Sequence, residues 1–457
     1  MEQVDEDWLG VLQFPSNQQK SQQARPSYWM SSPRSLATTS RVHNFTFGTG
    51  SEIWINELAP SIACASKEVV IVTCFWARSD SLIALNGALL QLSARALREN
   101  TTIKVRICFS SCSFLQKVLH TRSLKGQHYP STVWQSQLGL PAPTDLGGLD
   151  LEVKSVFVLP FSVMHPKFVL IDRQRVFLPS CNVSWEEWFE GCIECSGDVV
   201  DRFVEFWKQF WANDHDRQDE YSDMSENSQN AGDDGEPSME GLAPAIPCNF
   251  LPSPHSVNPH FTLPWLPCNQ PPPTPLNIYL LTLFARAEHC IRIQTPNLTS
   301  PPVISALQDA LCRGINVSIL TSERLMTLEQ LVTAGTTTSR CMKKMMNAHR
   351  NLLSRQGNIN RRELEDGLLN RSIGKLQISY FTHHAGNQDG SNAVQSHLKL
   401  TMIDEKIVVF GSGNLDRASW FTSQELGVAF KSSDLVNNVA ASLDTAMANR
   451  QKVVYNS

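Results

Sequence analysis

The first half of the chain carries a strand–helix–strand pattern of apolar residues. Residues 68–76 (EVVIVTCFW) form an apolar run rich in β-branched side chains, which predicts a buried strand. Residues 81–100 place apolar side chains at helical spacing, and residues 102–109 (TIKVRICF) again predict a strand. This order predicts a right-handed βαβ unit on a parallel or mixed sheet.

The second half repeats the pattern. Residues 290–297 and 316–322 predict strands, and residues 303–315 between them predict a helix. Each half then closes with a further strand that carries a polar motif. We therefore predict an α/β fold with two duplicated α/β domains packed about a pseudo-two-fold axis.

Polar and proline-rich segments set the expected domain boundaries. Residues 1–44, rich in Ser, Gln and Pro, predict a disordered arm before a first domain at 45–211. Residues 212–275 are acidic and then proline-rich, which predicts a surface linker without a helix or a sheet ladder. The second domain is expected at 276–455.

Each half contains the motif His-x-Lys-x4-Asp, followed by Ser-x-Asn at the same spacing in both copies. The residues are His165, Lys167, Asp172, Ser180 and Asn182 in the first copy and His397, Lys399, Asp404, Ser412 and Asn414 in the second. The pairs Trp188-Phe189 and Trp420-Phe421 follow their Asn at equal spacing. A single copy could arise by chance, and a single strand His is most often structural, but two matched copies favour a functional site.

The residue types suit displacement at phosphorus. Side chains two apart on a strand share a face, so the His and Lys of each motif are expected to point into one cleft. One His can attack phosphorus and the other can protonate the leaving oxygen, while Lys and Asn side chains neutralise the phosphate oxygens. The sequence therefore predicts one active site that is assembled from both halves.

Composition narrows the class of protein. Twelve scattered Cys residues predict free, largely buried thiols in a reducing compartment. No apolar stretch reaches membrane-spanning length and the N-terminus lacks a secretory pattern, so an intracellular protein, soluble or peripheral to a membrane, is expected. The net charge of −5 comes from residues 212–242, and the mildly positive remainder suits an anionic substrate without the strongly basic stripe of a duplex binder.

The two motifs resemble the paired signature HxKxxxxDxxxxxxGSxN of the phospholipase D superfamily over residues 45–455, apart from the linker. Residues 291–320 look closest to cardiolipin synthase-like phosphatidyltransferases. The resemblance implies phospholipase D-like domains, a phosphohistidine intermediate and no metal or other cofactor. The Gly of the signature is Pro179 in the first copy.

The resemblance also implies roles for the residues. His165 would be the nucleophile and His397 the general acid and then base, with Lys167 and Lys399 on the phosphate. Ser180, Asn182, Ser412 and Asn414 would belong to the substrate-binding set. Glu194 and Glu425 would orient the two His side chains, with Glu190 as the alternative to Glu194. Asp172 and Asp404 would complete the catalytic motifs in a supporting role.

Three functions remain open at this stage. The leading one is phospholipid hydrolysis or phosphatidyl transfer at a peripheral membrane surface. Trp185 and the two Trp-Phe pairs could then form the wall of an entrance for acyl chains, although packing in the domain core explains Trp188 and Trp420 more simply. The second is a nuclease that uses the basic segment 340–364, although a solvated helix face explains that segment more simply. The third is an inactive scaffold.

Two further expectations concern the surface and the assembly. His383 and His384 are expected to lie in a surface loop without a metal. A monomer is expected to suffice for catalysis because both motifs are in one chain.

Overall fold

The computed structural model describes most of the chain. The described residues are 2–13, 29, 32–113, 116, 120–121, 123, 125–157, 163–218, 244–253, 271–366 (side chains to 356), 372–383 and 393–457.

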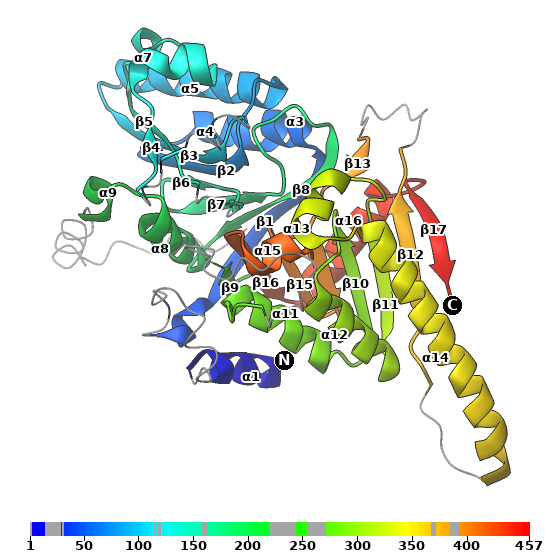
Figure 1. Cartoon of the computed structure of the whole chain (residues 1–457). Coiled ribbons are helices and arrows are strands. Elements are labelled where there is room, and N and C mark those ends of the chain that lie inside the picture. The colour runs from blue at the N-terminus through cyan, green and yellow to red at the C-terminus, as the bar shows by residue number, and fades with distance from the viewer. Residues whose placement is uncertain are drawn as a thin grey trace.

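The first unit is built around a mixed sheet (Figure 1). Its strands lie in the spatial order β4 (Gln127–His128), β5 (Leu149–Ser155), β3 (Ile103–Ser111), β2 (Glu68–Phe75), β6 (Phe168–Ile171), β7 (Arg175–Pro179), β8 (Trp188–Ser196) and β1 (Ala37–Thr49). Strands β2, β3 and β5 are parallel, and the others pair antiparallel. The β-branched run in β2 is buried on both faces, as a central parallel strand requires.

The second unit repeats this order. Its strands are β17 (Gln451–Asn456), β12 (Leu376–Phe381), β11 (Asn316–Thr321), β10 (Cys290–Thr295), β14 (Leu400–Ile403), β15 (Ile407–Gly411), β16 (Glu425–Lys431) and β9 (Ile246–Ser253). Strands β10, β11 and β12 are parallel. The short β13 (Gln395–Ser396) pairs with β8 of the first unit. The predicted α/β class with two units is confirmed.

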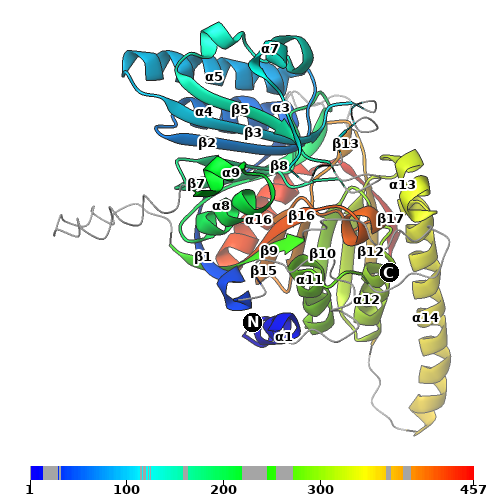
Figure 2. The ribbon, with the colours of Figure 1, turned by 60° about the vertical axis from the view of Figure 1, so that its left-hand side comes forward.

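Helices cover the sheets (Figures 1 and 2). Those of the first unit and its N-terminal extension are α1 (Glu2–Gln13), α3 (Gly50–Ile53), α4 (Ala59–Ala63), α5 (Asp80–Arg98), α7 (Ser131–Val133), α8 (Val199–Phe210) and α9 (Asp214–Gln218). Those of the second unit are α11 (Pro275–Arg286), α12 (Pro301–Cys312), α13 (Thr327–Ala334), α14 (Thr338–Asp366), α15 (Arg417–Phe421) and α16 (Ser433–Ala446). Short helical turns occupy Pro33–Leu36, Trp54–Leu58, Trp134–Leu138 and Pro143–Leu146. In α5, Ser79 caps the first turn, and the apolar positions at helical spacing are buried.

Strand β1 joins the two sheets. Residues Ala37–Ser40 pair with β9, and residues from Arg41 to Thr49 pair with β8 (Figure 1). The two units therefore share a continuous strand, and the structure holds them side by side with one seam between them. No helix in the described part of the chain is long and apolar enough to cross a membrane.

The prediction of a disordered arm at residues 1–44 is wrong for its described parts. Trp8 of α1 is fully buried, donates a hydrogen bond from Nε1 to the carbonyl of Pro275 at 3.0 Å, and packs edge-on against Tyr279. Residues from Ala37 onward belong to β1. The segment is polar overall, but it forms a helix with one apolar face, and that face packs against α11. The rest of the predicted arm, at 14–28 and 30–31, lies outside the described residues.

The prediction of a linker without regular structure at 212–275 is also wrong in part. Strand β9 lies inside it and pairs with both β1 and β16. Asp216 on α9 is fully buried and accepts a hydrogen bond from Arg106 Nε at 2.7 Å. Proline is tolerated in β9 because Pro247 and Pro252 stand near the two ends of the strand. Residues 219–243 and 254–270 lie outside the described residues.

Candidate active site

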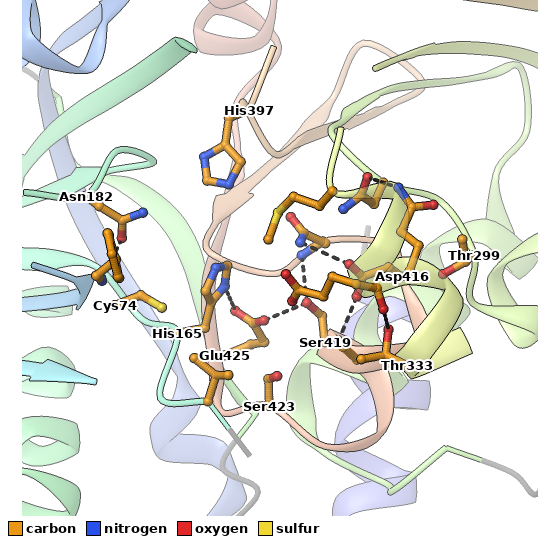
Figure 3. Close-up of a pocket in the computed structure, with 18 of the residues that line it drawn as sticks. Cys74, His165, Asn182, Thr299, Thr333, His397, Asp416, Ser419, Ser423 and Glu425 are labelled. Atoms are coloured by element: carbon orange, nitrogen blue, oxygen red, sulfur yellow. Dashed lines mark hydrogen bonds and ion pairs between the residues drawn. The ribbon is translucent and has the colours of Figure 1, made fainter. Parts of the chain in front are cut away.

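The two motifs meet at a cavity of about 240 Å³ on the seam between the units. Both His165 and His397 line it, and Figure 3 shows their rings facing the same space. The other motif residues on its wall are Asn182, Asn414 and Glu425. The structure thus brings both predicted imidazoles into one site.

Each His is held by the unit to which it does not belong. His165 donates its backbone N–H to the carbonyl of Gln424 at 2.9 Å, and its Nδ1 lies 2.9 Å from Glu425 Oε2. His397 donates its N–H to the carbonyl of Phe189 at 2.9 Å, and its Nδ1 lies 2.7 Å from Glu190 Oε1. In each ring Nδ1 is hydrogen-bonded to a carboxylate, so Nε2 is the nitrogen that can attack phosphorus or transfer a proton.

The structure corrects the expected backbone of the motifs. His165 and Lys167 lie in the extended segment just before β6, and His397 and Lys399 lie just before β14. The strands themselves hold the apolar residues that follow. Extended backbone still puts residues two apart on one side, but the His side chains gain their orientation from β8 and β16 across the seam.

Glu190, and not Glu194, is the carboxylate that orients His397. Glu194 instead pairs with Arg175 at 3.0 Å. Strand register explains the error: Cys192 lies opposite Pro179, as Gly427 lies opposite Gly411, so Glu190 and Glu425 are equivalent. The loop between Asn and Glu is three residues shorter in the first copy, and counting from Asn therefore misplaced the residue.

Ser180 and Ser412 support these carboxylates and do not line the cavity, contrary to their expected place in the substrate-binding set. Ser180 donates to Glu190 Oε2 and accepts the N–H of Gly191 at 2.9 Å. Ser412 donates to Glu425 Oε2 at 2.5 Å. Both hydroxyls are buried behind their Glu, so each motif builds a Ser–Glu–His chain that crosses between the units.

The two Lys residues lie beneath the His backbone. Lys167 Nζ donates to the carbonyl of His165 at 3.0 Å, and Lys399 Nζ donates to the carbonyl of His397 at 2.5 Å. Burial lowers the pKa of Lys399 to about 7, with Lys167 adding to the effect and Glu190 opposing it. Neither Lys is among the residues that line the cavity, although both were expected to hold the phosphate.

Burial also favours neutral imidazoles. It lowers the pKa of His397 to about 3 against the charge of Glu190, and it lowers the pKa of His165 against Glu425. For the two Glu side chains, burial alone would raise the pKa, but the paired His lowers it below its usual range. The arrangement is an ionised carboxylate that accepts a hydrogen bond from a neutral ring.

Asp172 and Asp404 lie at the other end of their strands, about 16 Å along the backbone from the Lys. Asp172 has a positive φ and accepts the N–H groups of Ser66, Lys67 and Glu68. Asp404 does the same for residues 288–290. Their place in the motif is structural: each anchors the start of a central parallel strand.

The two Asn side chains differ in orientation. Asn182 Oδ1 accepts the N–H of Phe75 at 3.2 Å, which leaves its amino group to donate. Asn414 donates from Nδ2 to Asp416 Oδ2 at 3.1 Å, and its buried Oδ1 has no hydrogen-bond partner among the described residues. The expected symmetric pair of amide donors is therefore not what the structure contains.

The two Trp-Phe pairs are not equivalent either. Trp188 starts β8, lines the cavity and packs against the His397 ring at 4.7 Å between centroids. Trp420 lies in α15 and is buried in the core, as the simpler interpretation expected. Trp188 stands two residues before Glu190 and Trp420 stands five before Glu425, so an equal distance from Asn does not make the two Trp residues equivalent. Trp185 is 67% exposed.

The remaining candidates lie away from the cavity wall. His383 Nδ1 bonds with the carbonyl of Ala393 at 3.2 Å and does not line the cavity, and His384 is outside the described residues. Among the described side chains, no group of three or more His, Cys, Asp or Glu is arranged to hold a metal ion.

Sequence reasoning missed a polar wall of the second unit. Asp416 accepts the N–H of Ser419 at 2.8 Å, and Ser419 Oγ donates to Glu425 Oε1 at 2.6 Å. Burial raises the pKa of Asp416. The equivalent of Asp416 by distance from Asn is Ser184, so comparison of the two copies did not single it out.

Part of this chain matches a family model, and its fold is similar to that of solved structures. Residues 280–447 match the family model described as "Cardiolipin synthase, PLD-like domain". The crystal structure of phosphatidylserine synthase from Haemophilus influenzae Rd KW20 is similar with a TM-score of 0.52 at 13% identity, over 92% of this chain and 90% of that one.

A phospholipase D family member, Nuc from Salmonella typhimurium, matches 40% of this chain and 91% of its own, with a TM-score of 0.27 and 18% identity. No curated protein matches the sequence. The family model covers the second unit, the first unit repeats its strand order, and both contribute their His to one cavity. Residues 280–447 are thus similar to a phospholipase D-like domain, and the fold of the whole chain is similar to that of the phosphatidylserine synthase.

Proposed function

We propose that the protein is a phosphodiesterase or phosphatidyltransferase that acts on phospholipids through a phosphohistidine intermediate and without a metal. The observation that carries the proposal is the pair of imidazoles on one cavity, each with Nδ1 bound to a carboxylate from the opposite unit. Such a pair supplies one nucleophile and one proton donor to the same phosphorus atom.

In the first step, the neutral Nε2 of His165 attacks phosphorus and the P–O bond to the leaving alcohol breaks. His397 takes up a proton when the anionic diester enters, because a negative charge beside the ring favours the imidazolium. It then donates that proton to the leaving oxygen. Glu425 stabilises the positive charge that develops on His165, and the Lys residues and Asn182 stabilise the phosphate oxygens.

In the second step, water or an alcohol attacks phosphorus as the P–N bond breaks. His397, now neutral, accepts the proton of the incoming oxygen, and His165 returns to its neutral form. Water gives hydrolysis, and an alcohol gives transfer.

A helix beside the cavity supports a lipid substrate. On α13, the side chains of Glu329, Gln330 and Thr333 line the cavity, whereas Leu328 is 77% and Val332 55% exposed. This is the reverse of an ordinary surface helix, which turns its apolar side inward. An exposed apolar face next to a phosphodiester site suits contact with acyl chains at a membrane surface.

Basic side chains lie on the next helix. Arg340, Lys343, Lys344 and Arg350 are exposed at helical spacing along α14. Anionic lipid head groups suit this face, and it is less suited to single-stranded nucleic acid, which needs stacking aromatic side chains as well.

The substrate class is tested by incubating the purified protein with phospholipid vesicles and with single-stranded DNA, in the presence of EDTA. We expect phosphatidate or an exchanged head group from the vesicles, and loss of this activity in His165→Ala. His383→Ala is the matched control, because this His lies off the cavity, and it should remain active. Shortened DNA with intact lipid would replace the lipid assignment with a nuclease.

The roles of the two His residues are tested with a p-nitrophenyl phosphodiester, whose leaving group needs no proton. His397→Ala should still release one equivalent of nitrophenol in a burst and retain an acid-labile phosphohistidine at His165. His165→Ala should give neither. A burst in His165→Ala, or an adduct on His397, would overturn the assignment.

A further inference from the structure

Beyond the two His residues, the cavity has an asymmetry that the duplicated motif does not predict. Figure 3 shows Asn182 and Cys74 on one side of the His pair, with Asp416, Thr299 and Thr333 on the other. The chemistry of the two sides differs, and the Asn side chains show how.

Hydrogen-bond partners fix the orientation of both amides. The Phe75 N–H can only donate, so it faces Asn182 Oδ1, and Asn414 Nδ2 donates to Asp416 Oδ2. The second copy consequently offers an acceptor, Asn414 Oδ1. This side chain is 9% exposed, and its Oδ1 has no partner among the described residues. A buried acceptor without a partner is costly, and a ligand that donates a hydrogen bond would remove the cost.

The charges on the cavity wall are also one-sided. Glu186, Glu329 and Asp416 line the cavity in addition to the His-bound Glu425, and none of the described lining residues is Lys or Arg. Glu186 Oε2 is a second buried oxygen without a hydrogen-bond partner in the described structure. Acidic walls repel a simple phosphodiester anion, so they suit a substrate that carries its own positive charge.

Helix capping does not account for these features. Asp416 caps α15, and its Oδ1 accepts a hydrogen bond from the Ser419 N–H. Its other oxygen, Oδ2, accepts the hydrogen bond from Asn414 Nδ2. The cap explains neither the unpartnered Asn414 Oδ1 nor the unpartnered Glu186 Oε2. The space of about 240 Å³ equals the volume of about eight water molecules, enough for a phosphate with a short substituent.

We propose that the wall formed by Asn414, Asp416 and Glu186 binds the ammonium group of a short amino alcohol esterified to the phosphate. The inference rests on the proposed function and names the head group that this site selects. The ammonium donates to Asn414 Oδ1 and is neutralised by the carboxylates, while the Asn182 amino group donates to the phosphate.

The test is calorimetric binding of two probes that differ only in the ammonium group, O-phosphoethanolamine and ethyl phosphate. We expect O-phosphoethanolamine to bind about tenfold more tightly to the wild-type protein. Asp416→Asn and Glu186→Gln should each reduce this ratio towards one. Glu187→Gln should keep it, because the neighbouring Glu187 is exposed and does not line the cavity.

Equal affinity for the two probes, or no binding of either, would overturn the inference. Glycerol phosphate carries hydroxyl groups in place of the ammonium group, so it tests whether the site accepts any hydrogen-bond donor. If it bound as tightly as O-phosphoethanolamine, the inference would also be overturned. The readout does not depend on turnover. A preserved ratio in a protein that leaves phospholipids intact would therefore refute the proposed function and not the head-group site.

Discussion

The two motif Lys residues occupy matching positions, yet Lys399 stands out by its chemistry. Its Nζ is enclosed beneath the His397 backbone, and burial brings its pKa to about 7. A group that titrates at this pH couples anion binding to proton uptake. The charge needed to hold a phosphate is therefore present below pH 7 and is lost above it.

We predict that binding of diethyl phosphate, which stays monoanionic throughout, weakens as the pH rises through 7. Loss of the Lys399 proton removes one of the two motif Lys charges, so the Kd should be constant below about pH 6 and rise through pH 7 to a weaker plateau. Titration calorimetry between pH 5.5 and 9 measures this. Lys399→Arg stays charged and should show a flat profile. A flat profile in the wild-type protein would contradict the prediction.

At the scale of single elements, β6 and β14 connect the chemistry to the core. Their apolar side chains are buried, the His-x-Lys segment precedes them, and an Asp with positive φ follows each. Because Asp172 and Asp404 tie the start of β2 and β10 to these ends, they act on the position of the motif through the strand.

We predict that Asp172→Ala lowers the free energy of unfolding by about 2 kcal/mol, because three backbone N–H groups lose a charged acceptor. Urea denaturation measures the loss. Asp172→Asn tolerates the positive φ and keeps one acceptor oxygen, so it should lose less. Activity per folded molecule should change far less than in His165→Ala. A stable but inactive Asp172→Ala would instead assign the Asp to the chemistry.

At the scale of the whole molecule, the active site depends on exchange between the units. Each unit supplies the His of one Ser–Glu–His chain and the carboxylate of the other. The backbone N–H of each His also donates its hydrogen bond to a carbonyl of the opposite unit. The shared strand β1 and the pairing of β13 with β8 hold this seam in register. Neither unit contains a complete Ser–Glu–His chain by itself.

We predict that each Glu variant reproduces the defect of the His in the opposite unit. Glu425→Gln should abolish the burst with the p-nitrophenyl phosphodiester, as His165→Ala does. Glu190→Gln should keep the burst and slow the release of the adduct, as His397→Ala does. Glu194→Gln is the matched control and should resemble the wild-type protein, since Glu194 pairs with Arg175. The opposite assignment of defects would contradict the exchanged pairing.

The sequence by itself determined the local elements and the two His residues that meet in the cavity. Strands at 68–76, 102–109, 290–297 and 316–322 and the helices between them were all predicted within a few residues, because long apolar patterns reflect burial directly. The spacing of His and Lys was readable because both residues lie on one extended segment. Helix α1 and strand β9 were not predictable in this way, since their partners α11, β1 and β16 are far away in the sequence.

The tertiary structure alone decided which groups meet across the seam. The assignment of Glu190 depends on the register of β8 against β7, and a three-residue difference in loop length hides that register from residue counting. The two Asn side chains occupy equal places in the motif, and their opposite orientations follow from Phe75 and Asp416, which lie outside the repeat. Contacts between distant segments set hydrogen-bond direction and burial, and these in turn set charge and pKa.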